Sequence, residues 1–281
     1  MELTRDLKLS RVGSAIICFG EIGSTNDYAR RWALDGAPDG ATVFAERQTN
    51  GRGRRGRTWE SPAGLGVLTS IILRQRPPGS DVACSLWLPA LGALAVRDSV
   101  FRVTGLVPQL KWPNDVYLGG RKLAGVLAES PGLGRPVILG IGLNVLESPS
   151  RGRAGFTPDV ASRSTSLWQV LNAESAAAST RTQPVKNGRD LRLNVARELL
   201  TALDALYEKW LEPGGPEFIA RVFRESLSTL SQRIVVHEHQ PTACWEGTAV
   251  DLLPDGALLV VDGAGREHRL TSGGTSIRHL A

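Results

Sequence analysis

Two hydrophobic periods alternate along this chain, and together they predict its elements of secondary structure. Short apolar or β-branched runs bounded by glycine and polar turns are typical of strands. They cover residues 15–19, 42–45, 66–73, 109–112, 116–118, 122–129 and 137–145. Apolar residues at three- and four-residue steps are typical of amphipathic helices. Helices are predicted over residues 25–34, 85–103, the turns that carry Leu199, Leu203, Leu206 and Trp210, and residues 217–227.

Capping and turn residues indicate where a helix begins and which strands form a hairpin. Ser24 or Thr25 can cap the helix over residues 25–34. Gly119 and Gly120 join two successive strands into a hairpin. Because hairpins join antiparallel strands, we expect an α+β fold with a mixed, largely antiparallel sheet and flanking helices, rather than a doubly wound parallel sheet.

The composition and the hydrophobic pattern of the chain change after residue 146. Residues 147–190 are rich in Ser, Gly, Ala, Arg and Pro, with no sustained period apart from an apolar patch around Leu167. We expect a mobile loop near 148–166 and a low-complexity linker near 173–186. From Arg233 onward, short alternating segments separated by turns predict a small antiparallel β-barrel or sandwich. The expected division is a main domain over 1–230, with 147–190 flexible inside it, and a C-terminal domain over 231–281.

The composition is that of a folded protein. With 281 residues, 42% hydrophobic and 22% charged, the chain has enough apolar material for a main domain and a small one. Its first residues mix charges where a secretory signal needs an apolar core, and its longest apolar run is too short to span a bilayer. Cys18, Cys84 and Cys244 lack metal or redox spacing, which favours reduced packing thiols. We therefore expect a cytoplasmic protein with no membrane partner.

The charge balance bears on a nucleic-acid partner. A net charge of +5 and a pI near 9.4 are compatible with one. The signal is weak, since arginine is spread through the chain and a solvated basic surface is the usual cause of a modest excess. There is also little room before Ser24 for a helix-turn-helix module. We expect no DNA binding, and a non-enzymatic nucleic-acid-binding protein remains an alternative.

The arginine loop, as we call residues 51–57, is the strongest chemical signal. Its sequence, Gly-Arg-Gly-Arg-Arg-Gly-Arg, interleaves glycines with arginines. Glycine lets a backbone approach a ligand, and guanidinium groups bind carboxylate and phosphate oxygens bidentately. The run also fits the Gly-x-Gly-x-x-Gly pattern, but Trp59, Pro62 and the following glycines exclude the helix that a dinucleotide site needs. The loop therefore indicates an anion-binding segment.

A second constellation follows at residues 111–115, Lys-Trp-Pro-Asn-Asp, and continues after a hairpin at residues 121–125, Arg-Lys-Leu-Ala-Gly. Strand geometry places Lys111 and Asp115 at the two ends of a tight turn, where both can face one ligand. Lysine offsets phosphate charge, and aspartate can hold Mg²⁺ or orient an attacking amine. A surface turn with an exposed ion pair would explain the same residues equally well.

Taken together, these blocks resemble those of the biotin protein ligases. The resemblance rests on Ser-Thr-Asn at 24–26, Gln48, the arginine loop through Trp59, the blocks at 111–115 and 121–125, and Gly-Ile-Gly-Leu-Asn at 140–144. All of them occur in the family's order, and the resemblance extends through the C-terminal barrel. It implies a class II synthetase-like catalytic domain that binds biotin and ATP, followed by an SH3-like barrel.

The resemblance also implies roles for individual residues. Biotin would be bound by Ser24, Thr25, Asn26, Gln48, Arg52, Gly53, Arg54, Lys122 and Gly125. ATP would be bound by Arg57, Lys111, Asn114 and Asn144. Arg54, Lys122 and Asp115 would be catalytic, and Asp115 could hold Mg²⁺. The cofactors implied are ATP and Mg²⁺, with biotin as substrate.

The implied activity has two steps. Biotin's carboxylate attacks the α-phosphorus of MgATP to give biotinyl-5′-AMP, while cations offset the like charges. A lysine of a biotin carboxyl carrier protein, or of such a domain in a biotin-dependent carboxylase, then attacks the mixed anhydride. The resemblance is to a ligase without an N-terminal DNA-binding domain, hence without repressor function, and it leaves a homodimer open. A lipoate-type ligase of similar architecture is an alternative.

Two further predictions concern residues outside these blocks. The segment after Asn144 departs from the family pattern, and Trp168 is a candidate for stacking on adenine. His237 and His239 alternate on one strand face and could hold a metal. Without a third ligand nearby, a solvent-facing pair is the better interpretation.

Overall fold

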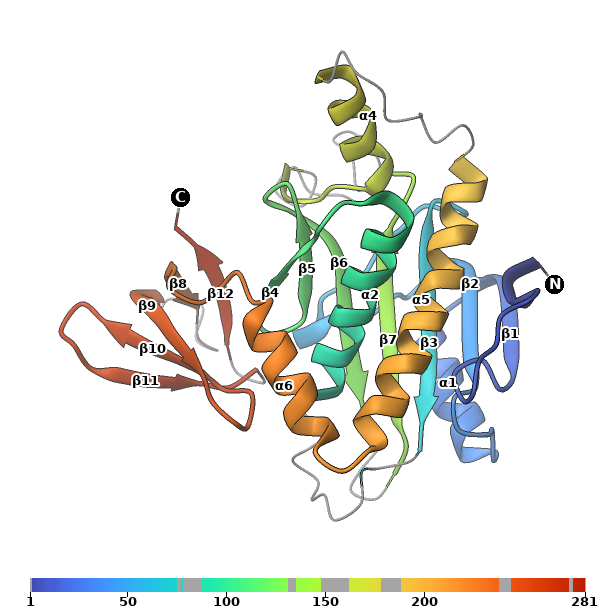
Figure 1. Ribbon diagram of the computed structural model, residues 1–281, viewed down its shortest axis with the longest axis horizontal. Coiled ribbons are helices and arrows are strands. Elements are labelled where there is room, and N and C mark those ends of the chain that lie inside the picture. The colour runs from blue at the N-terminus through green and yellow to red at the C-terminus, as the bar shows by residue number, and fades with distance from the viewer. Residues whose placement is uncertain are drawn as a thin grey trace.

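A seven-stranded sheet forms the centre of the fold (Figure 1). The structure is a computed structural model that describes residues 2–74, 77, 87–130, 135–147, 162–177, 188–237, 244–272 and 275–280. The strands follow one another across the sheet in the order β1 (Ile16–Ile22), β2 (Thr42–Gln48), β3 (Gly66–Leu73), β7 (Val137–Asn144), β6 (Arg121–Glu129), β5 (Asp115–Leu118) and β4 (Gln109–Lys111). β1 and β2 are parallel, and each other neighbouring pair is antiparallel. The prediction of a mixed, largely antiparallel sheet is confirmed.

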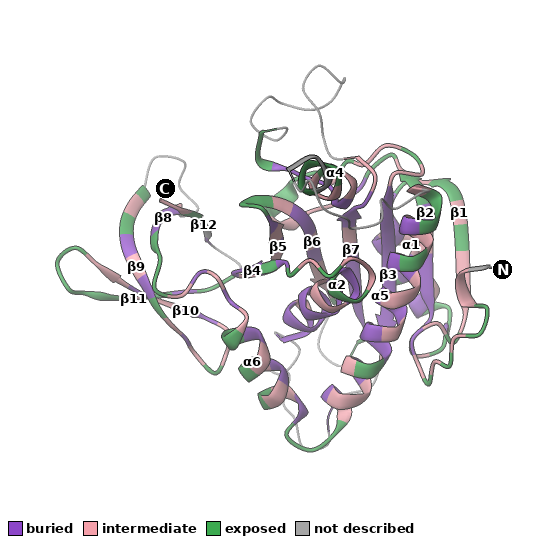
Figure 2. Cartoon of the chain, turned by 45° about the horizontal axis from the view of Figure 1, so that its top comes forward, coloured by how far each residue is buried: buried purple, intermediate pink, exposed green. Residues whose placement is uncertain are grey.

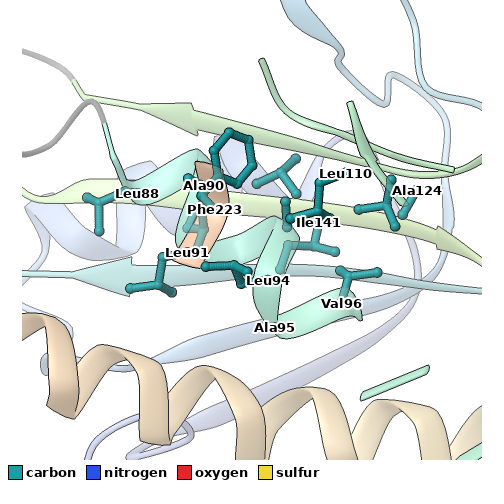
Figure 3. Packing of buried hydrophobic residues seen from close by; sticks show 14 of the residues in the cluster. Leu88, Ala90, Leu91, Leu94, Ala95, Val96, Leu110, Ala124, Ile141 and Phe223 are labelled. Carbon is teal, nitrogen blue, oxygen red and sulfur yellow. The ribbon is translucent and has the colours of Figure 1, made fainter. Parts of the chain in front are cut away.

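Long helices cover one face of this sheet. α2 (Leu88–Thr104) and α5 (Gly188–Leu211) lie side by side along it, and α6 (Gly215–Glu225) packs against both (Figure 1). α2 is apolar around most of its circumference because it lies between the sheet and α5. Figure 3 shows Leu91 and Leu94 of this helix beside Ile141 of β7 and Phe223 of α6. The central strands of the sheet are buried, as Figure 2 shows. Every residue of β3 is buried.

The opposite face is shared between a helix and a cavity. α1 (Thr25–Leu34) packs there against β2, β3 and β7. Side chains alternate across a strand, so in β7 Leu139 and Leu143 enter the core under α2 while Ile138 lies under α1. On the same face as Ile138, Gly140 and Gly142 follow. These positions have no side chain, so the sheet keeps an open floor beside α1.

The C-terminal residues form a second, five-stranded antiparallel sheet. Its order is β11 (Glu267–Leu270), β10 (Leu258–Asp262), β9 (Cys244–Leu252), β8 (Arg233–His237) and β12 (Ser276–His279). Two indoles attach it to the rest of the chain: Trp87 Nε1 donates to the Pro254 carbonyl at 3.1 Å and Trp112 Nε1 to the Gly256 carbonyl at 3.0 Å. Apolar residues of both sheets belong to one cluster, so the small sheet has its own strands but shares a core.

The region after residue 146 contains more structure than its composition indicated. α4 spans Leu167–Ala177, and the side chain of Ser166 accepts a hydrogen bond from the Gln169 N–H at its start, at 3.2 Å. A linker without secondary structure was therefore the wrong prediction for residues 173–177, and α5 begins already at Gly188. Residues 148–161 and 178–187 lie outside the described part of the chain.

The remaining predicted elements agree with the structure to within a few residues. The helix over 25–34 and the strand over 66–73 have the predicted bounds, and Ser24 caps α1. Cys18 and Cys244 are exposed, so the prediction that they pack inside was wrong, while Cys84 lies outside the described residues. None of the helices in the described part of the chain has the length and apolar character that crossing a bilayer requires.

Candidate active site

A cavity of about 1110 Å³ lies on the open face of the main sheet, between α1, the arginine loop and the C-terminal sheet. Every residue to which the resemblance assigned biotin binding, ATP binding or catalysis lines it. These residues are Ser24, Thr25, Asn26, Gln48, Arg52, Gly53, Arg54, Arg57, Lys111, Asn114, Asp115, Lys122, Gly125 and Asn144. Segments more than a hundred residues apart in sequence therefore meet around one space.

One end of the cavity is built from neutral polar groups. Ser24, Thr25 and Asn26 start α1 and are 3%, 3% and 5% exposed. Gln48 Oε1 accepts hydrogen bonds from the Thr25 N–H at 2.7 Å and from the Thr25 hydroxyl at 3.0 Å. The Ser70 hydroxyl lies 2.7 Å from Thr25 Oγ1 and 2.5 Å from Asn26 Oδ1. A network of this kind fixes its members, and it suits an uncharged ligand with several hydrogen-bonding groups.

The floor of the cavity depends on glycine. A Cβ at Gly142 would lie 2.3 Å from the indole of Trp59, and one at Gly140 would lie 2.1 Å from Asn26 Oδ1. Both values are far below a van der Waals contact, so these positions let Trp59 and Asn26 rest directly on β7. Trp59 Nε1 is buried and has no hydrogen-bond partner among the described residues. The indole N–H therefore packs against β7 at Gly142.

The arginine loop forms a small hairpin over this floor. The Trp59 N–H donates to the Gly51 carbonyl at 2.9 Å, and the Gly53 N–H donates to the Arg57 carbonyl at 2.7 Å. Its tip is one 3₁₀ turn, η2 (Arg54–Gly56), in which Arg55 has a left-handed φ of 60°. The residues that follow run into an extended segment and turns. The prediction that no helix follows the glycines is confirmed, and a dinucleotide-type loop is excluded.

Two arginines attach the hairpin at its ends. Near the base, Arg52 Nη2 lies 2.7 Å from Glu129 Oε2 and 3.0 Å from Asp27 Oδ1. At the tip, Arg54 Nη1 donates to Asn114 Oδ1 at 2.9 Å, and Arg54 Nη2 donates to the carbonyl of Ser272. Burial lowers the pKa of Arg54, and the positive Arg55 and Arg57 act in the same direction, while Asp115 opposes them. Arg54 therefore joins the hairpin to both sheets.

The other end of the cavity is cationic. Lys111 and Asp115 face each other across the β4–β5 turn, as the sequence indicated. Lys111 is 9% exposed, and burial lowers its pKa, helped by the positive Lys122 and Arg163 and opposed by Asp115. Lys122 Nζ lies 2.6 Å from Asp115 Oδ1. The pair at this turn is therefore part of a cavity wall rather than an exposed surface ion pair.

Buried amides complete this end. Asn114 is 7% exposed and donates to the Val126 carbonyl, while Asn144 is 3% exposed and donates to the Thr165 carbonyl at 3.0 Å. The Thr165 N–H in turn donates to the Lys122 carbonyl at 2.9 Å. The segment before α4 is thereby pinned beside β6. Burial, together with the negative Asp115, raises the pKa of Tyr117, another lining residue, to about 12.

Sequence reasoning missed part of the lining. Residues from the C-terminal sheet, His237, Thr275, Ile277, Arg278 and His279, also face the cavity. The prediction of a solvent-facing His237 was wrong, since its Nε2 is buried without a hydrogen-bond partner among the described residues; His239 lies outside them. Burial and the positive Arg278 lower the pKa of His237. No local pattern could reveal this, because a strand position does not show which neighbour it faces.

Two other expectations concern the adenine and a metal. Trp168 packs against the apolar core at the start of α4 and is not among the described residues that line the cavity. Across the described residues, no group of three or more His, Cys, Asp or Glu side chains could hold a metal ion. Asp115 provides a single carboxylate at the cationic end. This fits a magnesium ion that arrives on nucleotide phosphates with few protein ligands, rather than a resident metal.

The two sheets, the cavity with a neutral and a cationic end, and the arginine hairpin across it define an α+β protein with a site for an activated or anionic small molecule. Residues 19–145 match the model of the biotin/lipoate A/B protein ligase family. A biotin--[acetyl-CoA-carboxylase] ligase of Mycobacterium tuberculosis is 35% identical over 223 residues, which are 77% of this chain and 72% of that protein. The chain belongs to this family, on its biotin ligase side.

Other biotin ligases match the chain over different lengths. The bifunctional ligase/repressor BirA of Bacillus subtilis is 36% identical over 172 residues, which are 60% of this chain and 51% of that protein. The chain thus spans about half the length of this relative. A structure of the biotin protein ligase from Aquifex aeolicus in complex with biotin and ATP matches with a TM-score of 0.67 and 24% identity, covering 95% of this chain and 100% of the other. That likeness confirms the fold.

Proposed function

We propose that this protein is a biotin protein ligase that activates biotin with MgATP to biotinyl-5′-AMP and transfers the biotinyl group to a lysine of a biotin carboxyl carrier domain. The observation that carries the proposal is the polarity of one cavity. Its neutral end, with Thr25, Asn26 and Gln48, suits a ureido ring, and its cationic end, with Lys111 and Lys122, suits a carboxylate and phosphates. Family membership supports the choice of biotin and ATP.

The first step joins two anions, so charge is its main obstacle. An oxygen of the biotin carboxylate attacks the α-phosphorus, the bond to the bridging oxygen breaks, and pyrophosphate leaves. Arg54, Lys111 and Lys122 line the cavity at the end where this charge gathers. Such fixed cations stabilise the transition state without forming a covalent bond. Asp115 would hold the magnesium ion that accompanies ATP, and the ion would offset phosphate charge.

The second step needs a free amine. The ε-amine of the carrier lysine attacks the carbonyl of the mixed anhydride, the C–O bond to phosphate breaks, and AMP leaves. Asp115 can orient this amine and accept its proton. Because Lys122 Nζ lies 2.6 Å from Asp115, the two groups have to separate before the amine takes that place. Lys122 is then available to the phosphate of AMP.

The hairpin and the C-terminal sheet would exclude water from the intermediate. A mixed anhydride is hydrolysed when water reaches it, so a ligase has to cover it between the two steps. The contacts of Arg54 with Asn114 on one side and Ser272 on the other are suited to holding such a cover. We therefore assign retention of biotinyl-5′-AMP to the arginine loop.

The partners follow from this activity. The protein partner would be a biotin carboxyl carrier domain of a biotin-dependent carboxylase. A homodimer through the main sheet would use β1, which is an edge strand; sedimentation of the purified chain measures this directly. We place the reaction in the cytoplasm, because the exposed thiols of Cys18 and Cys244 suit a reducing compartment.

The deciding experiment measures pyrophosphate release by the purified protein with biotin and ATP. The proposal expects release that depends on both substrates, and biotinylation of an added carrier domain but not of its lysine-to-arginine variant. Lipoate in place of biotin separates a lipoate-type ligase. A nucleic-acid binder would instead show salt-sensitive RNA or DNA affinity and no biotin dependence. Absence of release with biotin rejects the proposed function.

A further inference from the structure

The carboxylate of Glu129 lies behind the neutral end of the cavity and binds two of its lining residues at once. Glu129 is the last residue of β6. Its Oε2 accepts a hydrogen bond from Asn26 Nδ2 at 2.7 Å and another from Arg52 Nη2 at 2.7 Å. Asn26 and Arg52 line the cavity, and Glu129, although described, is not part of that lining. Any effect of Glu129 on a ligand must therefore pass through these two side chains.

Glu129 determines which way the amide of Asn26 points. An ionised carboxylate can only accept, so Asn26 has to turn its NH₂ group toward it. The Asn26 carbonyl then faces the buried Ser70 hydroxyl, 2.5 Å away, which donates to it. On its other side this carbonyl rests against Gly140, where a Cβ would lie 2.1 Å from it. The amide is held in one orientation by groups on three strands, β3, β6 and β7.

Glu129 also fixes the base of the arginine loop. The Nη2 atom of Arg52 lies between Glu129 Oε2 and Asp27 Oδ1, so two carboxylates on α1 and β6 hold one guanidinium on the hairpin. Such charge-assisted hydrogen bonds are roughly twice as strong as neutral ones. The Arg52 Nε atom, in contrast, is buried and has no hydrogen-bond partner among the described residues. The position of the Arg52 guanidinium therefore depends on Glu129 and Asp27.

We propose that Glu129 is a positioning residue for biotin: it orients the Asn26 amide and holds the Arg52 guanidinium at the base of the arginine loop, without touching the ligand. This inference rests on the proposed function, which puts biotin at this end. Loss of the Glu129 carboxylate should therefore raise the Kd and the KM for biotin. It should not change the KM for ATP. A residue with a merely structural role would lower the stability of the protein instead and would not separate the two substrates.

Glu129→Gln tests the proposal with little change of shape. A neutral amide oxygen accepts these two hydrogen bonds more weakly than a carboxylate does. The glutamine can also present its NH₂ group instead, which lets the Asn26 amide turn over. We expect the Kd for biotin, measured by calorimetry without ATP, to rise about tenfold, with a parallel rise in the KM for biotin and a KM for ATP within about twofold of wild type. The matched control is Glu46→Gln, whose carboxylate pairs with Arg192 outside the cavity; it should leave all three unchanged.

A double-mutant cycle with Arg52→Ala shows whether Glu129 acts through the hairpin. If it does, Glu129→Gln has a smaller effect on biotin affinity in the Arg52→Ala background than in wild type. Glu129→Asp, which keeps the charge on a shorter side chain, covers the case that the glutamine variant does not fold. An unchanged biotin Kd in either variant, or strictly additive effects, overturns the inference. If wild type itself does not bind biotin, the proposed function has failed instead.

Discussion

Lys122 and Asp115 carry opposite charges at the point where the two half-reactions of the proposed ligase would meet. Their side chains are 31% and 24% exposed, so the pair is neither deeply buried nor free in solvent. Because water reaches both side chains, we expect the pair to contribute about 1 kcal/mol or less to folding. Because its stabilisation is small, the pair can open for a substrate at little cost. In the proposed ligase, we therefore expect Lys122 to contribute to catalysis more than to stability.

The variant Lys122→Ala separates these two contributions. We expect pyrophosphate release to fall by about 10²–10³-fold, the usual cost of removing one group that stabilises transition-state charge. The melting temperature should stay within a few degrees of wild type. The matched control is Lys209→Ala: Lys209 lies on α5, away from the cavity, and its ammonium pairs with the exposed Glu212 just after the helix. Full activity of the Lys122 variant at saturating substrates would remove Lys122 from the first step.

At the scale of elements, the arginine hairpin is held at its base and at its tip, as the proposed cover over the intermediate requires. Arg52 binds carboxylates at the base, and Arg54 bridges Asn114 and the Ser272 carbonyl at the tip. The backbone between them carries a left-handed turn at Arg55 and Gly56. Loss of the tip contacts should open the cover and leave its base in place, because the two sets of contacts share no atom.

Arg54→Gly removes the tip contacts. We expect biotinyl-5′-AMP to leave the protein at least about tenfold faster, since each lost hydrogen bond to a charged group is worth about 1.5–3 kcal/mol. Escaped intermediate would label lysines of an added bystander protein, which a streptavidin blot detects. Arg266→Gly, a change of the same type at an exposed turn, should show no such labelling. If Arg54→Gly retains its intermediate as wild type does, the cover lies elsewhere.

The floor of the cavity can be tested through β7. Gly142→Ala would place a Cβ 2.3 Å from the Trp59 indole. The ring has to move off the strand, so we expect weaker biotin binding together with a stability loss of about 1–3 kcal/mol, the usual cost of overpacking. Calorimetry and urea unfolding measure the two effects. Gly20→Ala on β1, where a new Cβ meets nothing within 4 Å, is the matched control. Normal biotin affinity in Gly142→Ala would show that Trp59 does not shape the site.

Elements with their own local signals could be predicted from the sequence. The helix over 25–34 has a serine cap and a regular apolar face, and the strand over 66–73 is largely apolar and rich in β-branched residues, so both were placed correctly. α4 was missed because its apolar start runs into alanine and serine, although Ser166 before Leu167 was a visible cap. The proposed role of Glu129 could not be predicted from the sequence. It depends on Asn26 and Arg52, which only the folded chain brings next to it.

At the scale of the whole molecule, the cavity needs both sheets. The main sheet provides its floor and its cationic end, while His237, Arg278 and His279 of the C-terminal sheet close one side. The proposed boundary at residue 231 therefore separates two sets of strands but not two independent sites. The indoles of Trp87 and Trp112 and the shared apolar cluster hold the sheets together. We infer that the two sets of strands unfold in one transition.

The contact between the two sheets should make the free energy of unfolding depend on pH. Burial lowers the pKa of both His237 and His279 from an ordinary 6.5, and the positive Arg278 and Lys111, respectively, add to the effect. A folded protein that binds protons less readily than its unfolded chain loses stability as the pH falls through the unfolded pKa. We therefore expect the urea midpoint to fall between about pH 7.5 and 5.5. The depressed pKa values of Asp251 and Asp262 act only below about pH 4, outside this window.

The double variant His237→Gln, His279→Gln identifies the source of this slope. Glutamine stays neutral at every pH, so the decline between pH 7.5 and 5.5 should become shallower, while stability at pH 7.5, where both imidazoles are neutral, changes little. Raising the ionic strength should weaken the wild-type decline as well, because salt screens the neighbouring arginines and Lys111. An unchanged slope in the variant would mean that other groups titrate in this range. The contact between the sheets would then not lower the pKa values of the two histidines.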